Sequence, residues 1–253
     1  MLKKLLLATA LTAMVGCDPI KDVIDDVTED TYVVTVGVEN GYAGDCPGAL
    51  LDCNNMCKLM KPYASKIHTL MDQQATYNAV VAAMKEGVKH NLFIFFYSGH
   101  GGYVATLTDR TEADGNDEFI CLYDKGLVDN TIWNIIKESK GRVFLIFDCC
   151  HSGTMYRTAK PLDFNKQLRK LAATSTVSGS INMLCWSGCP DSTYSYGSKD
   201  GGELTNTLRK YFKSSMTYNE LWNKIESDKS LKEYEKVQRT IMGKNFGSSK
   251  IFR

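Results

Sequence analysis

Apolar positions along the chain recur with two spacings, one typical of β-strands and the other typical of α-helices. The strand-like runs lie at 32–38, 66–70, 92–97, 143–148 and 181–186. The helix-like runs lie at 54–60, 76–85, 129–138, 204–212 and 218–225. Strands that alternate with helices usually build a parallel sheet covered by helices. The pattern therefore predicts an α/β fold, a three-layer sandwich with a mainly parallel central sheet and helices on both faces.

Two of the strand-like runs are apolar at every position up to residues 97 and 147. They are Leu-Phe-Ile-Phe-Phe-Tyr at 92–97 and Val-Phe-Leu-Ile-Phe at 143–147. A strand whose side chains are apolar on both sides is usually covered on both faces. We therefore expect these two strands at the centre of the sheet.

The first 17 residues have the pattern of an export signal. Lys3 and Lys4 precede an apolar run from Leu5 to Val15, which is too short to span a bilayer, and Gly16 and Cys17 follow it. A small residue and a cysteine after such a run resemble a bacterial lipoprotein signal. We expect lipidation of Cys17 and an exported protein anchored to a membrane of the bacterial cell envelope; simple secretion and an uncleaved segment are the alternatives.

Residues 18–31 form an acidic segment, which we interpret as a solvated tether ahead of a single domain at 32–253. Lys21 is its only basic residue, and its acids are Asp18, Asp22, Asp25, Asp26, Glu29 and Asp30. The whole chain is balanced, with 30 basic against 29 acidic residues and a formal net charge of +1. Such a chain has no overall field to attract nucleic acid, so we expect no nucleic-acid partner.

The nine cysteines show no spacing typical of a disulfide framework or a zinc site. Cys46, Cys53 and Cys57 could include one disulfide bridge. Cys121 and Cys185 lie in apolar runs, so we expect both to be inert thiols in the core.

A polar motif follows each of the two central strands. The first is Ser-Gly-His-Gly-Gly at 98–102, and the second is Asp-Cys-Cys-His-Ser-Gly at 148–153. Ligands of parallel sheets bind beyond the carboxyl ends of the strands, so we expect both motifs on loops at one edge. His100 would then be a general base for the nucleophilic thiol of Cys150. His151 is expected to point away and to have a structural role.

The alternation of side chains along an extended chain sorts the residues of these motifs. Ser98 shares a side with His100, and Asp148 shares a side with Cys150, whereas Cys149 points to the opposite face and is expected to pack in the core. The backbone N–H groups of residues 101 and 150 are candidates for stabilising an oxyanion, which is worth about 3–4 kcal/mol per donor in other enzymes. A lone His or Cys is more often structural, but the joint placement favours catalysis.

With these motifs the chain resembles the caspase and metacaspase superfamily, whose signatures are S-G-H-G and D-x-C-H-S-G. Further similarity lies at 47–52, 75–76, 114–118, 202–208 and 217–221. The resemblance implies a caspase-like α/β sandwich and a cysteine endopeptidase with Cys150 as nucleophile and His100 as base. A thiol ester would form and then be hydrolysed by water.

The resemblance also implies a pocket for the side chain that precedes the cleaved bond. Asp52, Ser98 and Asp148 match the residues that line this pocket in metacaspases, which cleave after Arg or Lys. Two carboxylates would repel an acidic side chain and pair with a cation. The expected substrates are therefore proteins or peptides with a basic residue at this position. The alternative role for Asp148 is to cap nearby backbone.

By the same resemblance, the domain divides into a large segment at about 32–156, a linker at about 157–179 and a small segment at about 180–253. The linker could be cleaved by the enzyme itself or could be a solvated basic loop. Its basic residues are Arg157, Lys160, Lys166, Arg169 and Lys170.

Calcium is the cofactor that the resemblance allows, since many metacaspases need it. Acids that supply suitable oxygen ligands are Asp109, Glu112, Asp114, Asp117 and Glu118. Arg157 and Asp129-Asn130 stand where the family commonly has an acid and an acidic pair. We therefore assign no metal ligand from the sequence.

Two other functions are alternatives. A catalytically inactive caspase-like module that binds partners at the membrane surface would keep the fold, but the intact pair of His100 and Cys150 argues against it. A cysteine phosphatase needs five residues between Cys and Arg in its phosphate loop, whereas six separate Cys150 from Arg157.

Overall fold

The computed structural model describes residues 29–105, 116–150, 181–188, 198–231, 237–243 and 246–252, and for residues 103–105, 116–118 and 150 it describes the backbone only. The signal segment with Cys17, most of the acidic tether and the basic linker lie outside the described residues. The predictions for these segments therefore stay predictions. Among the described helices, none is long and apolar enough to cross a membrane.

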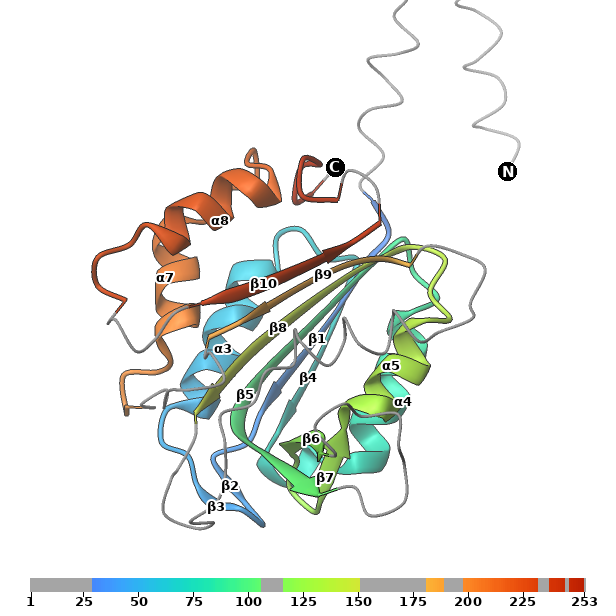
Figure 1. Cartoon of the computed structure of the whole chain (residues 1–253), viewed down its shortest axis with the longest axis vertical. Coiled ribbons are helices and arrows are strands. Elements are labelled where there is room, and N and C mark those ends of the chain that lie inside the picture. Colours follow the sequence, from blue (N-terminus) through green and yellow to red (C-terminus); the bar gives the residue numbers. More distant parts are fainter. Residues whose placement is uncertain are drawn as a thin grey trace, which may run out of the picture.

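A central sheet runs through the domain with strand order β10-β9-β8-β5-β1-β4 (Figure 1). The strands are β1 (Thr31–Gly37), β4 (Lys66–Met71), β5 (Leu92–Ala105), β8 (Arg142–Cys150), β9 (Asn182–Ser187) and β10 (Gln238–Met242). Neighbours are parallel except for β10, which is antiparallel to β9. The prediction of a mainly parallel sheet, with the all-apolar strands β5 and β8 at its centre, is confirmed.

Helices cover both faces of the sheet, which confirms the predicted three layers (Figure 1). The helices α4 (Tyr77–Gly87) and α5 (Asp129–Ile136) pack on one face. The other face carries α3 (Ala49–Met60), α7 (Glu203–Tyr211) and α8 (Tyr218–Glu226). Each helix buries an apolar stripe against the sheet, which is the main source of its stability.

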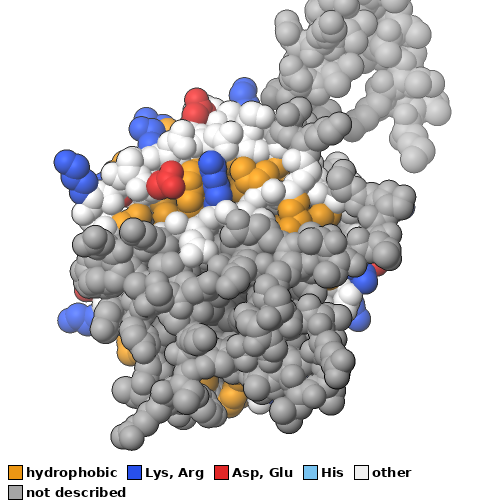
Figure 2. Space-filling model, viewed as in Figure 1, with side chains coloured by type: hydrophobic (Ala, Val, Ile, Leu, Met, Phe, Trp, Pro, Cys, Tyr) orange, Lys and Arg blue, Asp and Glu red, His pale blue; other side chains and the backbone are white. Residues whose placement is uncertain are grey.

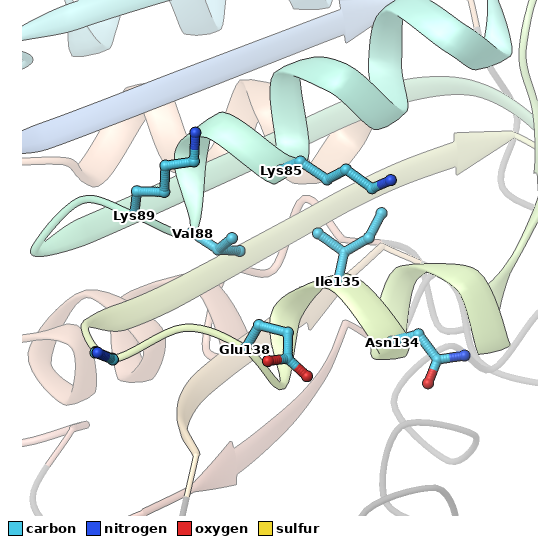
Figure 3. Close-up of a pocket in the computed structure, with 7 residues that line it drawn as sticks. Lys85, Val88, Lys89, Asn134, Ile135 and Glu138 are labelled. Carbon is cyan, nitrogen blue, oxygen red and sulfur yellow. The ribbon is translucent and has the colours of Figure 1, made fainter.

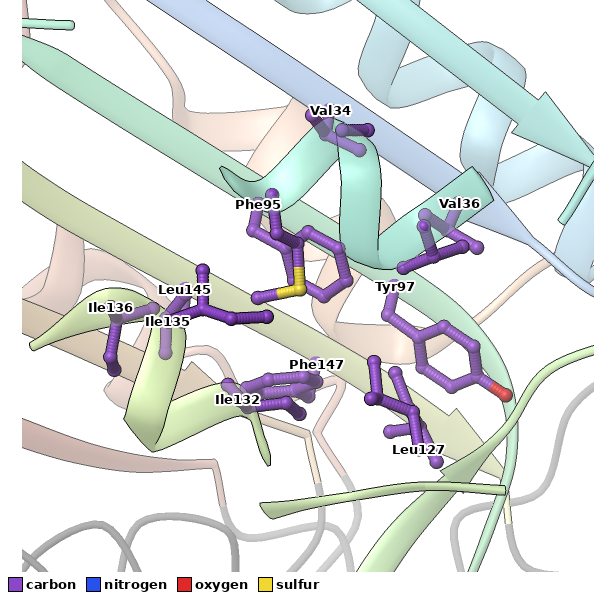
Figure 4. Packing of buried hydrophobic residues seen from close by; sticks show 14 of the residues in the cluster. Val34, Val36, Phe95, Tyr97, Leu127, Ile132, Ile135, Ile136, Leu145 and Phe147 are labelled. Atoms are coloured by element: carbon purple, nitrogen blue, oxygen red, sulfur yellow. The ribbon is translucent and has the colours of Figure 1, made fainter. Parts of the chain in front are cut away.

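The two sides of the central strands supply the two halves of the core. Phe95 and Phe147 project toward α4 and α5, with ring centroids 6.0 Å apart (Figure 4). On the opposite face the Phe144 ring packs edge-on against Trp186 and Tyr218, at 4.8 and 5.1 Å. These are favoured geometries for aromatic pairs. Burial on both sides explains why β5 and β8 needed apolar residues at every position.

The central strands extend further than the apolar runs predicted. β5 continues to Ala105 and β8 to Cys150, so the described residues of both motifs lie on strands and not on loops. The two strands stay paired as far as His100 and Cys150. Beyond that point β5 pairs with the antiparallel strand β6 (Asn116–Cys121), which in turn pairs with β7 (Gly126–Val128). Backbone pairing decides where these strands end, and the polarity of the side chains does not predict that pairing.

Helix α3 begins at Ala49, earlier than the predicted start at residue 54. Its first turn has an inverted pattern, because Leu51 is exposed and Asp52 is buried. Gly48 precedes the helix with φ of 95°, and a Cβ there would lie 2.2 Å from the Ser198 carbonyl oxygen. This left-handed conformation and close contact require glycine.

The disulfide considered for Cys46, Cys53 and Cys57 is not present, since all three are free thiols. Cys57 Sγ accepts a hydrogen bond from the Thr69 hydroxyl at 3.5 Å, and burial raises the pKa of Cys53 to about 12. Both thiols therefore pack between α3 and the sheet as small side chains. Cys121 and Cys185 are buried as expected.

The described surface mixes the two signs of charge. Figure 2 shows Lys and Arg side chains interspersed with Asp and Glu around a strip of apolar side chains. The large apolar side chains exposed in the described part of the chain are Tyr42, Leu51 and Ile241. The mixture agrees with the net charge of +1.

Candidate active site

The two motifs meet at the carboxyl end of the sheet because β5 and β8 are adjacent and parallel. Their register pairs Ser98 with Asp148 and His100 with Cys150. Backbones of neighbouring strands lie about 4.8 Å apart. The base and the nucleophile expected from the sequence therefore occupy facing positions on neighbouring strands.

The residues between these pairs face the opposite side. Cys149 is 5% exposed and packs in the core beneath α4 and α5, near Phe147. The expected packing role of Cys149 is confirmed. Ser98 and Asp148 are also buried, each 1% exposed, but they face α3 and α7.

The imidazole ring of His100 is buried and hydrogen-bonded. Its Nε2 lies 2.9 Å from the carbonyl oxygen of Asp45. A carbonyl can only accept, so Nε2 carries a hydrogen, and in the neutral ring the lone pair resides on Nδ1. The hydroxyl of Tyr97 holds the His100 backbone, at 2.6 Å from its carbonyl oxygen and 2.7 Å from that of Cys121. Nδ1 is thus the ring atom that can accept a proton.

The three residues expected to form a pocket come from three elements. Asp52 lies in the first turn of α3, Ser98 on β5 and Asp148 on β8. The hydroxyl of Ser98 donates to Oδ2 of Asp52 at 2.9 Å. This hydrogen bond joins the first turn of α3 to β5, although Asp52 and Ser98 are 46 positions apart in the sequence.

The amino end of α7 brings Asp52 and Asp148 together. The N–H of Gly202 donates to both carboxylate oxygens of Asp52, at 3.0 and 2.9 Å, and the N–H of Thr205 donates to Oδ2 of Asp148 at 2.7 Å. The first amides of a helix and its dipole favour negative charge. Asp148 therefore does cap backbone, as the alternative role proposed, but the helix it caps is distant in sequence.

Gly202 is a site residue that was not singled out from the sequence. A Cβ at this position would lie 2.4 Å from both oxygens of Asp148, while its N–H holds Asp52. Only glycine leaves room for the two carboxylates on either side of it. The signal that could have revealed it is the Gly-Gly pair immediately before a helical pattern.

Burial dominates the electrostatics of the two carboxylates. Burial, followed by the charge of Asp148, raises the pKa of Asp52 to about 7, although hydrogen bonds from Gly202 and Ser98 oppose the shift. Burial also raises the pKa of Asp148. Oδ1 of Asp148 has no hydrogen-bond partner among the described residues. A buried carboxylate pair with an unused acceptor is suited to a cationic donor.

No metal site is evident in the described part of the chain, which holds no group of three or more His, Cys, Asp or Glu side chains arranged to bind an ion. Of the acids proposed as calcium ligands, Asp109, Glu112 and Asp114 lie outside the described residues, and only the backbone is described for Asp117 and Glu118. The calcium prediction is therefore not tested, and we derive no step from a metal.

A separate groove of about 540 Å³ lies between α4 and α5 (Figure 3). Its lining residues are Lys85, Val88, Lys89, Asn134, Ile135, Glu138 and Lys140. The carboxyl end of α4 leads into the beginning of β5, whereas His100 lies near the other end of that strand. The candidate site residues do not line this groove, so it is distinct from the site of His100 and Cys150.

The chain is similar to proteins of one known family. The caspase domain model matches residues 31–245. Metacaspase-1 of Pyricularia oryzae is 34% identical over 135 residues, covering 45% of this chain and 34% of that protein. Metacaspase-1 of Botryotinia fuckeliana is 30% identical over 212 residues, covering 75% of this chain and 48% of that protein. The chain thus spans a third to a half of the length of these relatives.

Among solved structures, protein GSU0716 from Geobacter sulfurreducens superposes with a TM-score of 0.68 at 21% identity, over 88% of this chain and 98% of that one. At this identity the likeness shows the fold alone. The family model covers most of the chain, including the sheet, α3 and both central strands. The chain therefore belongs to the caspase-domain family of cysteine peptidases, and metacaspases are among its relatives.

Proposed function

We propose that this protein is a cysteine endopeptidase that cleaves peptide bonds after Arg or Lys. The observation that carries the proposal is the register of β5 and β8, which sets His100 opposite Cys150 two residues beyond the buried pair Ser98 and Asp148. A base, a nucleophile and an acidic pocket thus lie at one edge of the sheet.

The reaction begins with transfer of the Cys150 thiol proton to Nδ1 of His100. The thiolate then attacks the carbonyl carbon of the scissile peptide bond. The Asp45 carbonyl, 2.9 Å from Nε2, supports this step because it accepts from the N–H that an imidazolium retains. A proton therefore enters and leaves the ring at a single nitrogen.

The negative charge that develops on the substrate oxygen is stabilised by the backbone N–H groups of Gly101 and Cys150. Collapse of the tetrahedral intermediate breaks the C–N bond, and the imidazolium returns its proton to the leaving amine. Water, deprotonated by His100, then hydrolyses the thiol ester and restores the Cys150 thiol. Each proton taken up by the ring is released within the same half-reaction.

The specificity for a basic residue follows from Asp52 and Asp148. A guanidinium or ammonium group of the substrate offers donors to Oδ1 of Asp148, which has no partner among the described residues, and offsets the repulsion between the carboxylates. An aspartate side chain would add further negative charge at a buried site, which is strongly unfavourable.

The segments outside the described residues have a place in this proposal. The linker at 157–179 contains five basic residues, so it offers bonds that the same active site would cleave. Lipidation of Cys17 would anchor the enzyme to a membrane of the cell envelope, and its protein substrates would be those that reach that surface.

Hydrolysis of short reporter peptides tests the proposal. Reporters with Arg, Lys or Asp before the leaving group are offered with and without calcium, and Cys150→Ala is the blank. We expect cleavage after Arg and Lys that the blank lacks. Asp148→Asn should lower kcat/KM for these reporters about 10- to 100-fold, the value of one charge-assisted hydrogen bond.

Asp52→Asn is a second probe of the pocket if Asp148→Asn does not fold. Cleavage after Asp would overturn the assignment of the pocket. Absence of cleavage under every condition would favour the inactive binding module instead.

A further inference from the structure

A small hairpin between β1 and α3 supplies the hydrogen-bond acceptor for His100. Its strands are β2 (Asn40–Gly41) and β3 (Gly44–Asp45), and their antiparallel register sets Asn40 directly opposite Asp45. The carbonyl of Asp45 accepts from Nε2 of His100. The orientation of the catalytic ring therefore depends on what holds this hairpin in place.

The peptide group that contacts His100 is bonded at both ends. Its C=O belongs to Asp45 and accepts from Nε2 at 2.9 Å. Its N–H belongs to Cys46 and donates to the carbonyl oxygen of Glu39 at 2.7 Å. The peptide unit thus connects the imidazole to Glu39, the residue just before the opposite strand of the hairpin.

The next peptide group continues the connection to a carboxylate. Its C=O is that of Glu39, and its N–H belongs to Asn40, which donates to Oδ1 of Asp72 at 3.0 Å. Two further contacts fix the carboxylate: Oδ1 also accepts from the N–H of Glu39 at 2.8 Å, and Oδ2 accepts from the Asn40 side chain at 3.1 Å. An unbroken series of hydrogen bonds therefore runs from the imidazole through two peptide groups to Asp72.

All the bonds in this series point the same way. Each peptide group accepts at its oxygen on the His100 side and donates from its N–H toward Asp72. Hydrogen bonds aligned in this manner polarise one another. A negative charge on Asp72 therefore strengthens the Asp45 carbonyl as an acceptor and favours a positive charge on the ring.

We propose that Asp72 is a positioning residue for His100, which acts through the two peptide groups to orient the imidazole and to stabilise its protonated form. The inference rests on the proposed function of His100 as the base. In a serine protease triad, a carboxylate orients the histidine by direct contact. Here Asp72 would orient His100 in the same way, but through two backbone peptide groups.

The conformation of Asp72 allows a clean set of variants. Its φ of 42° lies in the left-handed region, which Asp, Asn and Gly adopt more readily than other residues. Asp72→Asn keeps an acceptor oxygen and removes the charge. Asp72→Gly removes the acceptor, and glycine adopts the same positive φ without strain. Asp124→Asn is the matched control, because Oδ1 of Asp124 also holds a backbone amide, that of Tyr77 at 2.7 Å, without a described connection to His100.

The first measurement is the pH profile of kcat and KM in the full chain, with an Arg reporter. We expect Asp72→Gly to lower kcat about 10-fold or more and Asp72→Asn about 3-fold, with KM unchanged, as for loss of orientation and of charge at a catalytic base. The acidic limb of the Asp72→Asn profile should move down by about half a pH unit, the effect of one charge through a partly solvated path. Asp124→Asn should match the wild type.

The second measurement does not depend on activity. The pKa of the His100 ring is followed by NMR titration in the full chain carrying Cys150→Ala, with and without Asp72→Asn. Two other ionisable residues are placed by the same strands and hairpin, Asp45, whose carbonyl contacts Nε2, and Asp148, two residues before Cys150 on β8, and these variants leave both in place. We expect the same downward shift of about half a unit.

A His100 pKa that is unchanged by Asp72→Asn would overturn the inference even if the enzyme is active. A shifted pKa in a chain that cleaves no reporter would support the connection while removing the proposed function. The two ideas can therefore fail separately.

Discussion

At the scale of the residue, Asp52 departs from the ordinary behaviour of a carboxylate. A carboxylate with 1% of its surface exposed, facing Asp148 across Gly202, carries a cost when it ionises. The amides at the start of α7 reduce this cost but do not remove it, since the pKa of Asp52 stays at about 7. We interpret this cost as the consequence of holding two carboxylates close together at a buried site, which agrees with the proposed binding of a basic side chain there.

The raised pKa of Asp52 predicts a pH dependence of folding stability. Between its ordinary value of 3.8 and its folded pKa of about 7, the folded state holds a proton that the unfolded state has released. Stability therefore falls as pH rises through this window and is lowest above it. Urea unfolding at pH 5 and pH 8 should show a smaller loss of stability for Asp52→Asn than for the wild type.

Asn at this position keeps a side-chain oxygen for the Gly202 amide, so the comparison isolates the charge. Equal slopes of stability against pH in the two proteins would show that Asp52 is already ionised in the folded state at pH 5.

At the scale of the element, two side chains close together in the sequence define the amino end of α8. Thr217 caps α8: its hydroxyl accepts from the Glu220 N–H at 3.2 Å, and the Glu220 carboxylate accepts from the Thr217 N–H at 2.7 Å. This reciprocal pair satisfies two amides that lack partners within the helix.

We expect Thr217→Ala to lower the free energy of unfolding by about 1 kcal/mol, the typical cost of losing an N-cap side chain. Urea denaturation would measure this change, with Asn223→Ala on the exposed side of the same helix as the control. A Thr217→Ala protein as stable as the control would mean that water replaces the cap without loss.

Elements with a strong apolar period were predictable, and those without one were not. The strands β1, β4, β5, β8 and β9 and the five helices were all expected from the pattern, because each buries a side or stripe against the core. The hairpin of β2 and β3 has two residues in each strand, too few for any period. β10 has the sequence Gln-Arg-Thr-Ile-Met, which mixes polar and apolar residues. Such a mixture is possible because β10 lies at the edge of the sheet and pairs with one strand, β9.

At the scale of the whole molecule, Arg142 joins three parts of the chain. It begins β8 and forms an ion pair with Glu29 just before β1. It also donates to the Ser249 hydroxyl at 2.9 Å and the Lys250 carbonyl oxygen at 3.3 Å, and it lies 5.5 Å from the centre of the Phe246 ring. The beginning and the end of the domain are therefore held to a central strand by a single guanidinium.

Arg142→Met is expected to lower the free energy of unfolding by about 2–4 kcal/mol, somewhat less than for a fully buried pair, since Glu29 keeps 13% exposure. The loss arises because the variant leaves the Glu29 carboxylate and the Lys250 carbonyl without their donor. Urea unfolding of Glu29→Gln, Arg142→Met and the double variant would measure the coupling. Strictly additive losses would show that the pair itself contributes nothing.

The sequence alone determined the class of fold, the two central strands and the two motifs at their carboxyl ends. It could do so because these features depend on local periods and on neighbouring residues. Only the tertiary structure decided which groups meet those motifs. Asp52 reaches Gly202 across 150 positions, and Asp72 reaches the amide of Asn40 across 32. Such contacts depend on how helices and hairpins pack against the sheet, and no local pattern of polar and apolar residues records that packing.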